Sequence, residues 1–277
     1  MPVTQLWCLP INAWKFDCLT TCDGMLCFRV NYSLALLCNP SIRKFKMLPP
    51  LTTPEKNYTP TLTLVYDRFT HNYKIIALIL NRNNKTEVEV NIHTLGTDYW
   101  TKIQDLPYDD KLSRPGIFVS DTVNWLMNEP RSAIEVIVSF DLEKESYQTL
   151  WNPVHDMQFK GLNTLGMVRD CLCILSHPHG HNFSDVWIMK EFGNDQSWIK
   201  LMSIPHKEHG FYHQCNELYI SKDDDQVVLE FLQEERLNKS LLIYDFVNKT
   251  SKIPQIQNIN NFITSKIYVE SLISPLF

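Results

Sequence analysis

The chain has 277 residues, 44% of them apolar and 12% aromatic, so it can bury a sizeable hydrophobic core. Its net charge of −5 argues against a general binder of nucleic acids or of anionic membranes, which would carry an excess of basic residues. The longest purely apolar run, residues 75–80, is far shorter than the roughly 20 residues of a membrane-spanning helix.

The N-terminal residues lack a basic segment followed by an apolar core, so they do not predict a signal peptide. Six of the eight cysteines lie in or beside apolar runs, where free thiols are commonly buried. We therefore expect reduced thiols in a cytoplasmic or nuclear protein.

The first recognisable unit spans residues 21–50 and begins with the turn pair Asp23-Gly24. Three short apolar or alternating runs follow it, separated by polar turns, and Pro49 closes the last one. The unit therefore predicts an antiparallel meander that is too small to be stable alone.

An apolar residue followed by proline closes several units along the chain. These prolines are Pro49, Pro107, Pro205 and Pro254, with a looser version at Pro153. The steps between the five prolines are 58, 46, 52 and 49 residues. A period near 50 residues is typical of a four-stranded, kelch-type propeller blade.

The turns inside the units also recur. Three of them place Asn or Asp after a Cys or an aromatic residue, in "CNPSIRKFKML", "FDLEKESYQTL" and "YDFVNKTSKIP", and "YDRFTHNYKII" has the same shape. Two others, "LGTDYWTKIQDLP" and "FGNDQSWIKLMSIP", share a Gly, an Asp-containing turn and a Trp two residues before Lys. Helix signals are nearly absent, so the pattern predicts an all-β repeat protein.

We interpret residues 1–277 as a single domain, a kelch-like β-propeller of six blades, with five blades as the alternative. Both chain termini are expected to close the last blade, because closure removes exposed sheet edges. The candidate closing segments are residues 13–19 and residues 262–274. Residues 1–20 would then serve as an N-terminal remnant or closing strand.

Six of these segments, in order and spacing from residue 21 to residue 275, resemble the F-box-associated domain of plant F-box proteins. They begin with "CDGMLCF" and end with "YVESLISP". The resemblance implies a non-catalytic module that recognises the substrate of an SCF (Skp1-cullin-F-box) ubiquitin ligase. The partner would be a protein or glycoprotein bound by the propeller loops.

The same resemblance places a helical F-box upstream of the propeller, and nothing in residues 1–20 matches it. We expect that this chain is a truncated copy, a fragment or a mis-started gene model. Skp1 would be bound only through the F-box that the chain lacks.

A zinc site is one hypothesis for "CLCILSHPHGH", which contains Cys171, Cys173, His177, His179 and His181. Zinc prefers four converging thiolate or imidazole ligands. Cys-X-Cys is an unusual ligand pair, however, and no second pair lies at finger spacing. The favoured interpretation is two core thiols and three surface imidazoles, with no metal site.

A nucleophile and a base could be drawn from "HKEHGFYHQC", which contains His206, Glu208, His209, His213 and Cys215. No nucleophile elbow accompanies these residues, so an inter-blade loop is favoured.

Calcium ligands could be drawn from Asp223, Asp224 and Asp225, but EF-hand spacing is absent and a solvated turn is favoured. With only eight glycines, a phosphate-cradling loop is not expected. We predict no catalytic residue and no cofactor.

Five tryptophans recur on the predicted strands and are expected to pack between blades, with a recognition role only near the ends of strands. They are Trp100, Trp125, Trp151, Trp187 and Trp198.

The favoured function is an interaction module. The alternative is a propeller enzyme, a hydrolase or an oxidase, with a metal or carboxylate site at the mouth of the channel. In the module the histidines should scatter, whereas in an enzyme several should converge. The residues that bind the target are not predicted, because recognition loops vary without changing the scaffold.

Overall fold

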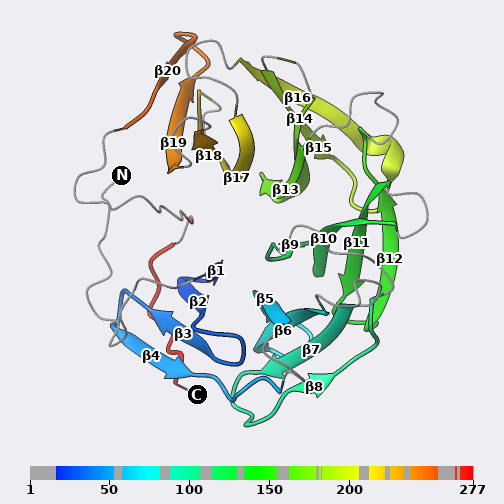
Figure 1. Ribbon diagram of the computed structural model, residues 1–277, viewed down its shortest axis with the longest axis vertical. Helices are drawn as coiled ribbons and strands as arrows, with labels where there is room; N and C mark the ends of the chain where they lie inside the picture. Colours follow the sequence, from blue (N-terminus) through cyan, green and yellow to red (C-terminus); the bar gives the residue numbers. More distant parts are fainter. Residues whose placement is uncertain are drawn as a thin grey trace.

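The computed structural model describes residues 17–52, 58–81, 88–106, 114–129, 134–154, 162–178, 181, 183–205, 212–221, 225–233, 238–254, 266 and 269–276. Within them, five four-stranded antiparallel sheets stand around a ring, with the first strand of each sheet nearest the centre (Figure 1). The structure is therefore a β-propeller, and the prediction of that fold is confirmed.

Each blade takes four strands that are consecutive in sequence. Blade 1 contains β1 (Asp17–Cys22), β2 (Met25–Arg29), β3 (Ala35–Asn39) and β4 (Lys44–Met47). Blade 2 contains β5 (Tyr58–Asp67), β6 (Asn72–Asn81), β7 (Val88–Thr94) and β8 (Thr101–Lys102). Blade 3 contains β9 (Ile117–Val119), β10 (Thr122–Asn128), β11 (Glu135–Asp141) and β12 (Ser146–Trp151).

Blade 4 contains β13 (Leu162–Val168), β14 (Cys171–His177), β15 (Phe183–Met189) and β16 (Trp198–Pro205). Blade 5 contains β17 (Tyr212–Ile220), β18 (Gln226–Gln233), β19 (Asn238–Asp245) and β20 (Thr250–Lys252). One 3₁₀ turn, η2 (Asp195–Ser197), precedes β16 and is the one helical element of the described residues. The near absence of helix agrees with the sequence.

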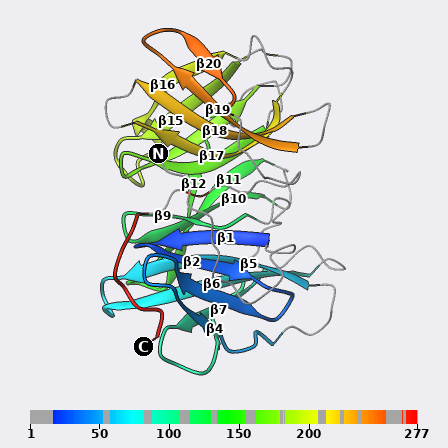
Figure 2. The same cartoon turned by 90° about the vertical axis from the view of Figure 1, so that its left-hand side faces the viewer.

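The blade count over the described residues is five, so the preferred count of six is wrong and the alternative is confirmed. Part of the front segment, from Asp17 on, supplies the innermost strand of blade 1 instead of an extra blade. Among the described residues, none of the five sheets combines strands from both termini. In the part of the back segment that the structure describes, residues 269–276 form no strand and instead run beside blade 1 (Figure 2).

Hydrogen bonds hold the C-terminal segment on blade 1. The buried Asn39 amide nitrogen donates to the carbonyl oxygens of Ser271 (3.0 Å) and Ile273 (2.8 Å) and lies 3.1 Å from the Ser271 hydroxyl. The Ser271 hydroxyl in turn donates to the carbonyl of Asp23 at 2.6 Å. Gly24 has φ +75°, and a Cβ there would lie 2.4 Å from the carbonyl oxygen of Val269. The chain end is therefore tied to the first hairpin by side chains and not by a sheet ladder.

Two-residue turns join the first two strands of three blades. In each, both turn residues have positive φ, as a type I′ hairpin requires. The pairs are Asp23-Gly24, Ser120-Asp121 and Arg169-Asp170. This explains the recurrence of Asp at these turns, since Asp tolerates the left-handed region better than most residues.

The recurring Asn or Asp of the longer turns has a common role. Its side chain accepts a backbone N–H two or three residues later, and a residue with positive φ follows four positions after it. The accepting residues are Asn39, Asp67, Asp141 and Asp245, with positive φ at Arg43, His71, Glu145 and Lys249. The Asp67 turn is the first hairpin of its blade, whereas the other three precede outer strands.

Four apolar clusters lie between neighbouring blades and form the core. They join blades 1 and 2, blades 2 and 3, blades 3 and 4, and blades 4 and 5. Ile76 and Trp125, for example, belong to the cluster between blades 2 and 3 and are almost fully buried. Burying one such side chain contributes roughly 1.5–3 kcal/mol, so packing between blades is the main stabilising term.

Candidate functional site

The described residues of the zinc hypothesis do not come together. Cys171 and Cys173 lie at one end of β14, and His177 ends the strand about 13 Å beyond Cys173 at the usual rise per residue. His177 is buried, with Nδ1 2.5 Å from the Ser184 hydroxyl, whereas His181 is exposed and packs against an aromatic ring. His179 lies outside the described residues.

Among the described residues, no three His, Cys, Asp or Glu side chains gather closely enough to hold a metal ion. Burial raises the pKa of the Cys173 thiol to about 12, so this thiol stays protonated and is a poor nucleophile or ligand.

The second candidate cluster lies largely outside the described residues. This applies to His206, Glu208 and His209, while His213 and Cys215 fall in β17 with side chains that are also outside the description. Of the acidic run, Asp223 and Asp224 are outside it as well. Asp225 is exposed in a turn, and its carbonyl accepts the Phe246 N–H at 2.7 Å.

The tryptophans divide into buried and exposed ones. Trp125 packs between blades 2 and 3 as expected, and Trp187 is half-buried with the Lys200 ammonium over its ring at 5.8 Å. Trp151 differs, because 45% of it is exposed at the end of β12. Of the five tryptophans, Trp151 is therefore the candidate for a recognition role near the end of a strand.

Two tryptophans join the outer strands of neighbouring blades. Trp100 Nε1 donates to the carbonyl of Pro49 at 2.9 Å, which links blade 2 to blade 1. Trp198 Nε1 donates to the carbonyl of Trp151 at 3.1 Å, which links blade 4 to blade 3. This explains the Trp shared by the two repeated segments, which end at the same kind of junction.

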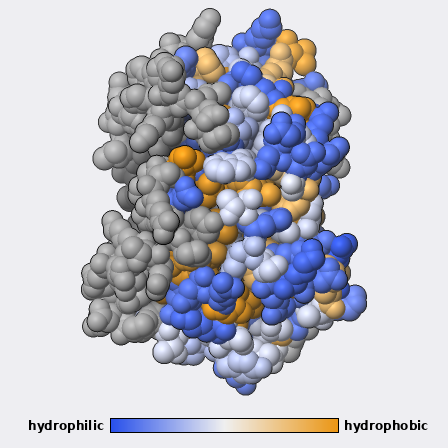
Figure 3. Space-filling view, turned by 90° about the vertical axis from the view of Figure 1, so that its right-hand side faces the viewer, coloured by the Kyte–Doolittle hydropathy of each residue, from blue (hydrophilic) through white to orange (hydrophobic). Residues whose placement is uncertain are grey.

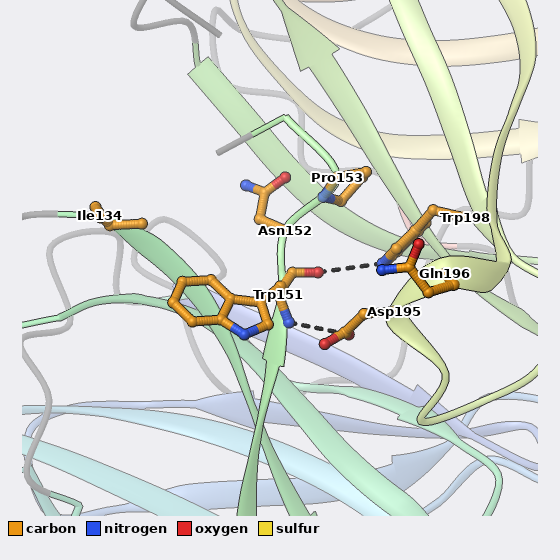
Figure 4. Close-up of a pocket in the computed structure, with 7 residues that line it drawn as sticks. All are labelled: Ile134, Trp151, Asn152, Pro153, Asp195, Gln196 and Trp198. Carbon is orange, nitrogen blue, oxygen red and sulfur yellow. Dashed lines mark hydrogen bonds between the residues drawn. The ribbon is translucent and has the colours of Figure 1, made fainter. Parts of the chain in front are cut away.

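The junction between blades 3 and 4 forms a shallow groove with a volume of about 370 Å³ (Figure 4). Trp151 N–H donates to Asp195 Oδ1 at 3.0 Å, so both main-chain polar groups of Trp151 are bonded to blade 4. The indole of Trp151 is turned towards Ile134 and away from Trp198 (Figure 4). The groove is lined by Ile134, Trp151, Asn152, Pro153, Asp195, Gln196 and Trp198.

A partly buried polar cluster lies next to the groove. Glu135 Oε2 accepts the Asn163 amide at 2.5 Å and lies 3.5 Å from that of Asn152. Arg114 donates to the Thr164 hydroxyl at 2.7 Å. Burial raises the pKa of Glu135 above its ordinary value, although the bond from Asn163 and the charge of Arg114 oppose this shift.

The arrangement can bind a ligand by surface contact. The groove offers an exposed aromatic ring and one carboxylate. On the side of the propeller that carries the outer strands of blades 2 to 4, separate hydrophobic patches lie among hydrophilic residues (Figure 3). Sequence reasoning named Trp151 only as one of five tryptophans and missed Asp195 as its partner. The aspartate of "FGNDQSW" was the available signal.

A family model described as the F-box associated beta propeller domain matches residues 3–275. The F-box/kelch-repeat protein At3g23880 of Arabidopsis thaliana is 32% identical over 267 residues, which cover 94% of this chain and 69% of that protein. The F-box protein CPR1 of the same plant is 24% identical, with 85% of this chain and 62% of that protein covered. The chain thus covers about two thirds of the length of each of these two relatives.

Two solved structures share the fold. YjhT is 11% identical, with a TM-score of 0.55 over 88% of this chain and 85% of that one. An oligogalacturonate lyase in complex with manganese is 13% identical, with a TM-score of 0.52 over 83% of this chain and 61% of that one. At these identities the likeness concerns the propeller fold alone.

Proposed function

This chain belongs to the F-box-associated β-propeller family, and on that premise we propose that it is the non-catalytic substrate-recognition module of an SCF ubiquitin ligase adaptor. The observation that carries the proposal is the family match over almost the whole chain, together with relatives that are F-box proteins. The target would be a protein or glycoprotein held on the propeller surface. Residues 1–277 would act as one domain.

Skp1 enters this proposal only through an F-box. The family model that matches residues 3–275 describes a propeller domain, and four apolar clusters of the described residues lie between blades. We therefore expect the propeller to bind the target and an F-box to be needed to pass that target to the ligase.

The proposed location is the cytoplasm or the nucleus. The described cysteines are free thiols, as expected in a reducing compartment. The described part of the chain contains no helix that is both long and apolar enough to cross a membrane. Neither a nucleic acid nor a membrane is proposed as a partner.

The competing function is a propeller enzyme. The protonated Cys173 and the separation of His177 from the cysteines of its strand support the non-catalytic proposal.

Two baits test the proposal, namely the 277-residue chain and the same chain fused behind the F-box segment of At3g23880. Both should retain the same proteins from plant extract, and only the fusion should retain Skp1 in stoichiometric amount. A stable complex of Skp1 with the unfused chain would overturn the account of Skp1 binding. Turnover of a captured small molecule would favour the enzyme.

A further inference from the structure

The groove between blades 3 and 4 displays an aromatic ring that the junction itself does not require. At the junction of blades 1 and 2, the residue whose carbonyl accepts the tryptophan N–H is Pro49. The residue in the same place between blades 3 and 4 is Trp151. Because proline serves at one junction, an indole is not needed to join two blades. The indole at position 151 therefore calls for another explanation.

The main chain under this ring is held firmly in place. Trp151 N–H is bonded to Asp195 and its carbonyl to Trp198, so both partners come from blade 4. The side chain is nevertheless 45% exposed. An aromatic side chain on a fixed backbone loses little conformational entropy when a ligand covers it, which is the property of a binding hot spot.

The charge of the groove indicates the ligand. Asp195 is the one ionisable residue among the seven that line it, and the whole chain carries a net charge of −5. The Asp195 carboxylate lies beside the main chain of Trp151, on the side away from the indole (Figure 4). The long side chain of an Arg or Lys laid across the Trp151 main chain would contact both the carboxylate and the tryptophan ring, the best aromatic partner for a cation. Acidic ligands would be repelled.

We propose that this groove binds an extended, basic segment of the target protein, with an Arg or Lys side chain against Trp151 and Asp195. Ile134 and Pro153 would take a neighbouring apolar side chain of the same segment. This inference rests on the proposed function, because it names the part of the target that the propeller recognises.

Titration of the full chain with labelled short peptides tests the site by fluorescence anisotropy. The probe contains one Arg flanked by Ile and Pro, and matched probes carry Gln or Glu instead of Arg. The Arg probe should bind at least about threefold more tightly than the Gln probe, and the Glu probe should be weakest. Trp151→Ala and Asp195→Asn should each remove most of this preference, because Asn keeps the acceptor for Trp151 N–H but removes the charge.

Tyr99→Ala is the matched control, since Tyr99 is 65% exposed in the corresponding turn of blade 2. It should leave binding of the Arg probe unchanged, and thermal unfolding should show that all variants are folded. Equal binding of the three probes, or unchanged binding by Trp151→Ala, would overturn the proposal. Binding of neutral chitotriose that is lost in Trp151→Ala would overturn it in favour of a glycan site.

Capture from plant extract separates the two proposals. If the wild-type chain and Trp151→Ala retain the same target, the recognition function stands and this groove is not its site. If the Arg preference holds in the titration but no protein target is retained, the proposed function fails while the groove chemistry stands.

Discussion

Asn39→Asp should detach the C-terminal segment from blade 1 without damaging the turn in which Asn39 lies. The turn needs only an acceptor at this position, because Asp67, Asp141 and Asp245 serve the equivalent turns. The C-terminal segment needs the donor, since the Asn39 amide nitrogen bonds the carbonyls of Ser271 and Ile273. Aspartate retains the first role and loses the second.

The size of the effect follows from these bonds. An amide nitrogen has two hydrogens, and each net hydrogen bond contributes roughly 0.5–1.5 kcal/mol. The variant also places a buried carboxylate against two carbonyl oxygens, which adds a desolvation cost of at least about 1 kcal/mol. The total loss should be about 2–4 kcal/mol for docking of the segment.

Hydrogen exchange of the amides in residues 271–276, followed by mass spectrometry, measures this loss directly. Exchange there should accelerate by roughly thirtyfold or more, while the strands of blades 2 to 4 keep their protection. Asp141→Asn is the matched control, because it changes the acceptor of an equivalent turn that holds no such segment. Unchanged exchange of residues 271–276 in Asn39→Asp would refute the reasoning.

Two pH-dependent predictions follow from buried groups. Burial raises the pKa of Glu135, so the fold disfavours the ionised form of this side chain. The free energy of unfolding of Glu135→Gln should therefore be at least as large as that of wild type near pH 7. Any advantage of the variant should shrink as the pH falls towards about 4.5, because Glu135 is then increasingly protonated. Thermal melts of the two proteins at both pH values check this, and a clear loss of stability in the variant near pH 7 would contradict it. Burial lowers the pKa of His93, whose Nδ1 lies 3.0 Å from the Tyr99 carbonyl, so wild type should lose stability as the pH falls below about 6.5. Melts between about pH 7.5 and pH 5.5 should show a smaller loss in His93→Gln, and equal losses would exclude His93 as the cause.

The strands and turns were predictable because their signals are local. Apolar runs bounded by Asp23-Gly24, or by the Asn39 and Asp141 turns, contain the hairpin chemistry in the residues themselves. The blade count was not predictable from the period. The two end segments were too short to form a blade alone, and the place of the C-terminal one depends on contacts of Asn39 with residues more than 200 positions away.

The candidate site was predictable only in part. Trp151 was one of five tryptophans placed on the predicted strands, but the groove exists because Asp195 and Trp198, more than 40 positions later, meet its main chain. That meeting depends on how blades 3 and 4 pack. The aspartate of "FGNDQSW" marks a turn in the sequence, but it does not show which blade that turn will meet.

The central claim is that this propeller recognises a protein and leaves chemistry to a ligase. Ubiquitination reconstituted with purified SCF components tests it most directly, using a captured target and the chain with or without the F-box segment of At3g23880. The account predicts that both forms bind the target equally and that only the fusion supports its ubiquitination. Binding without ubiquitination by the fusion, or ubiquitination supported by the unfused chain, would contradict it.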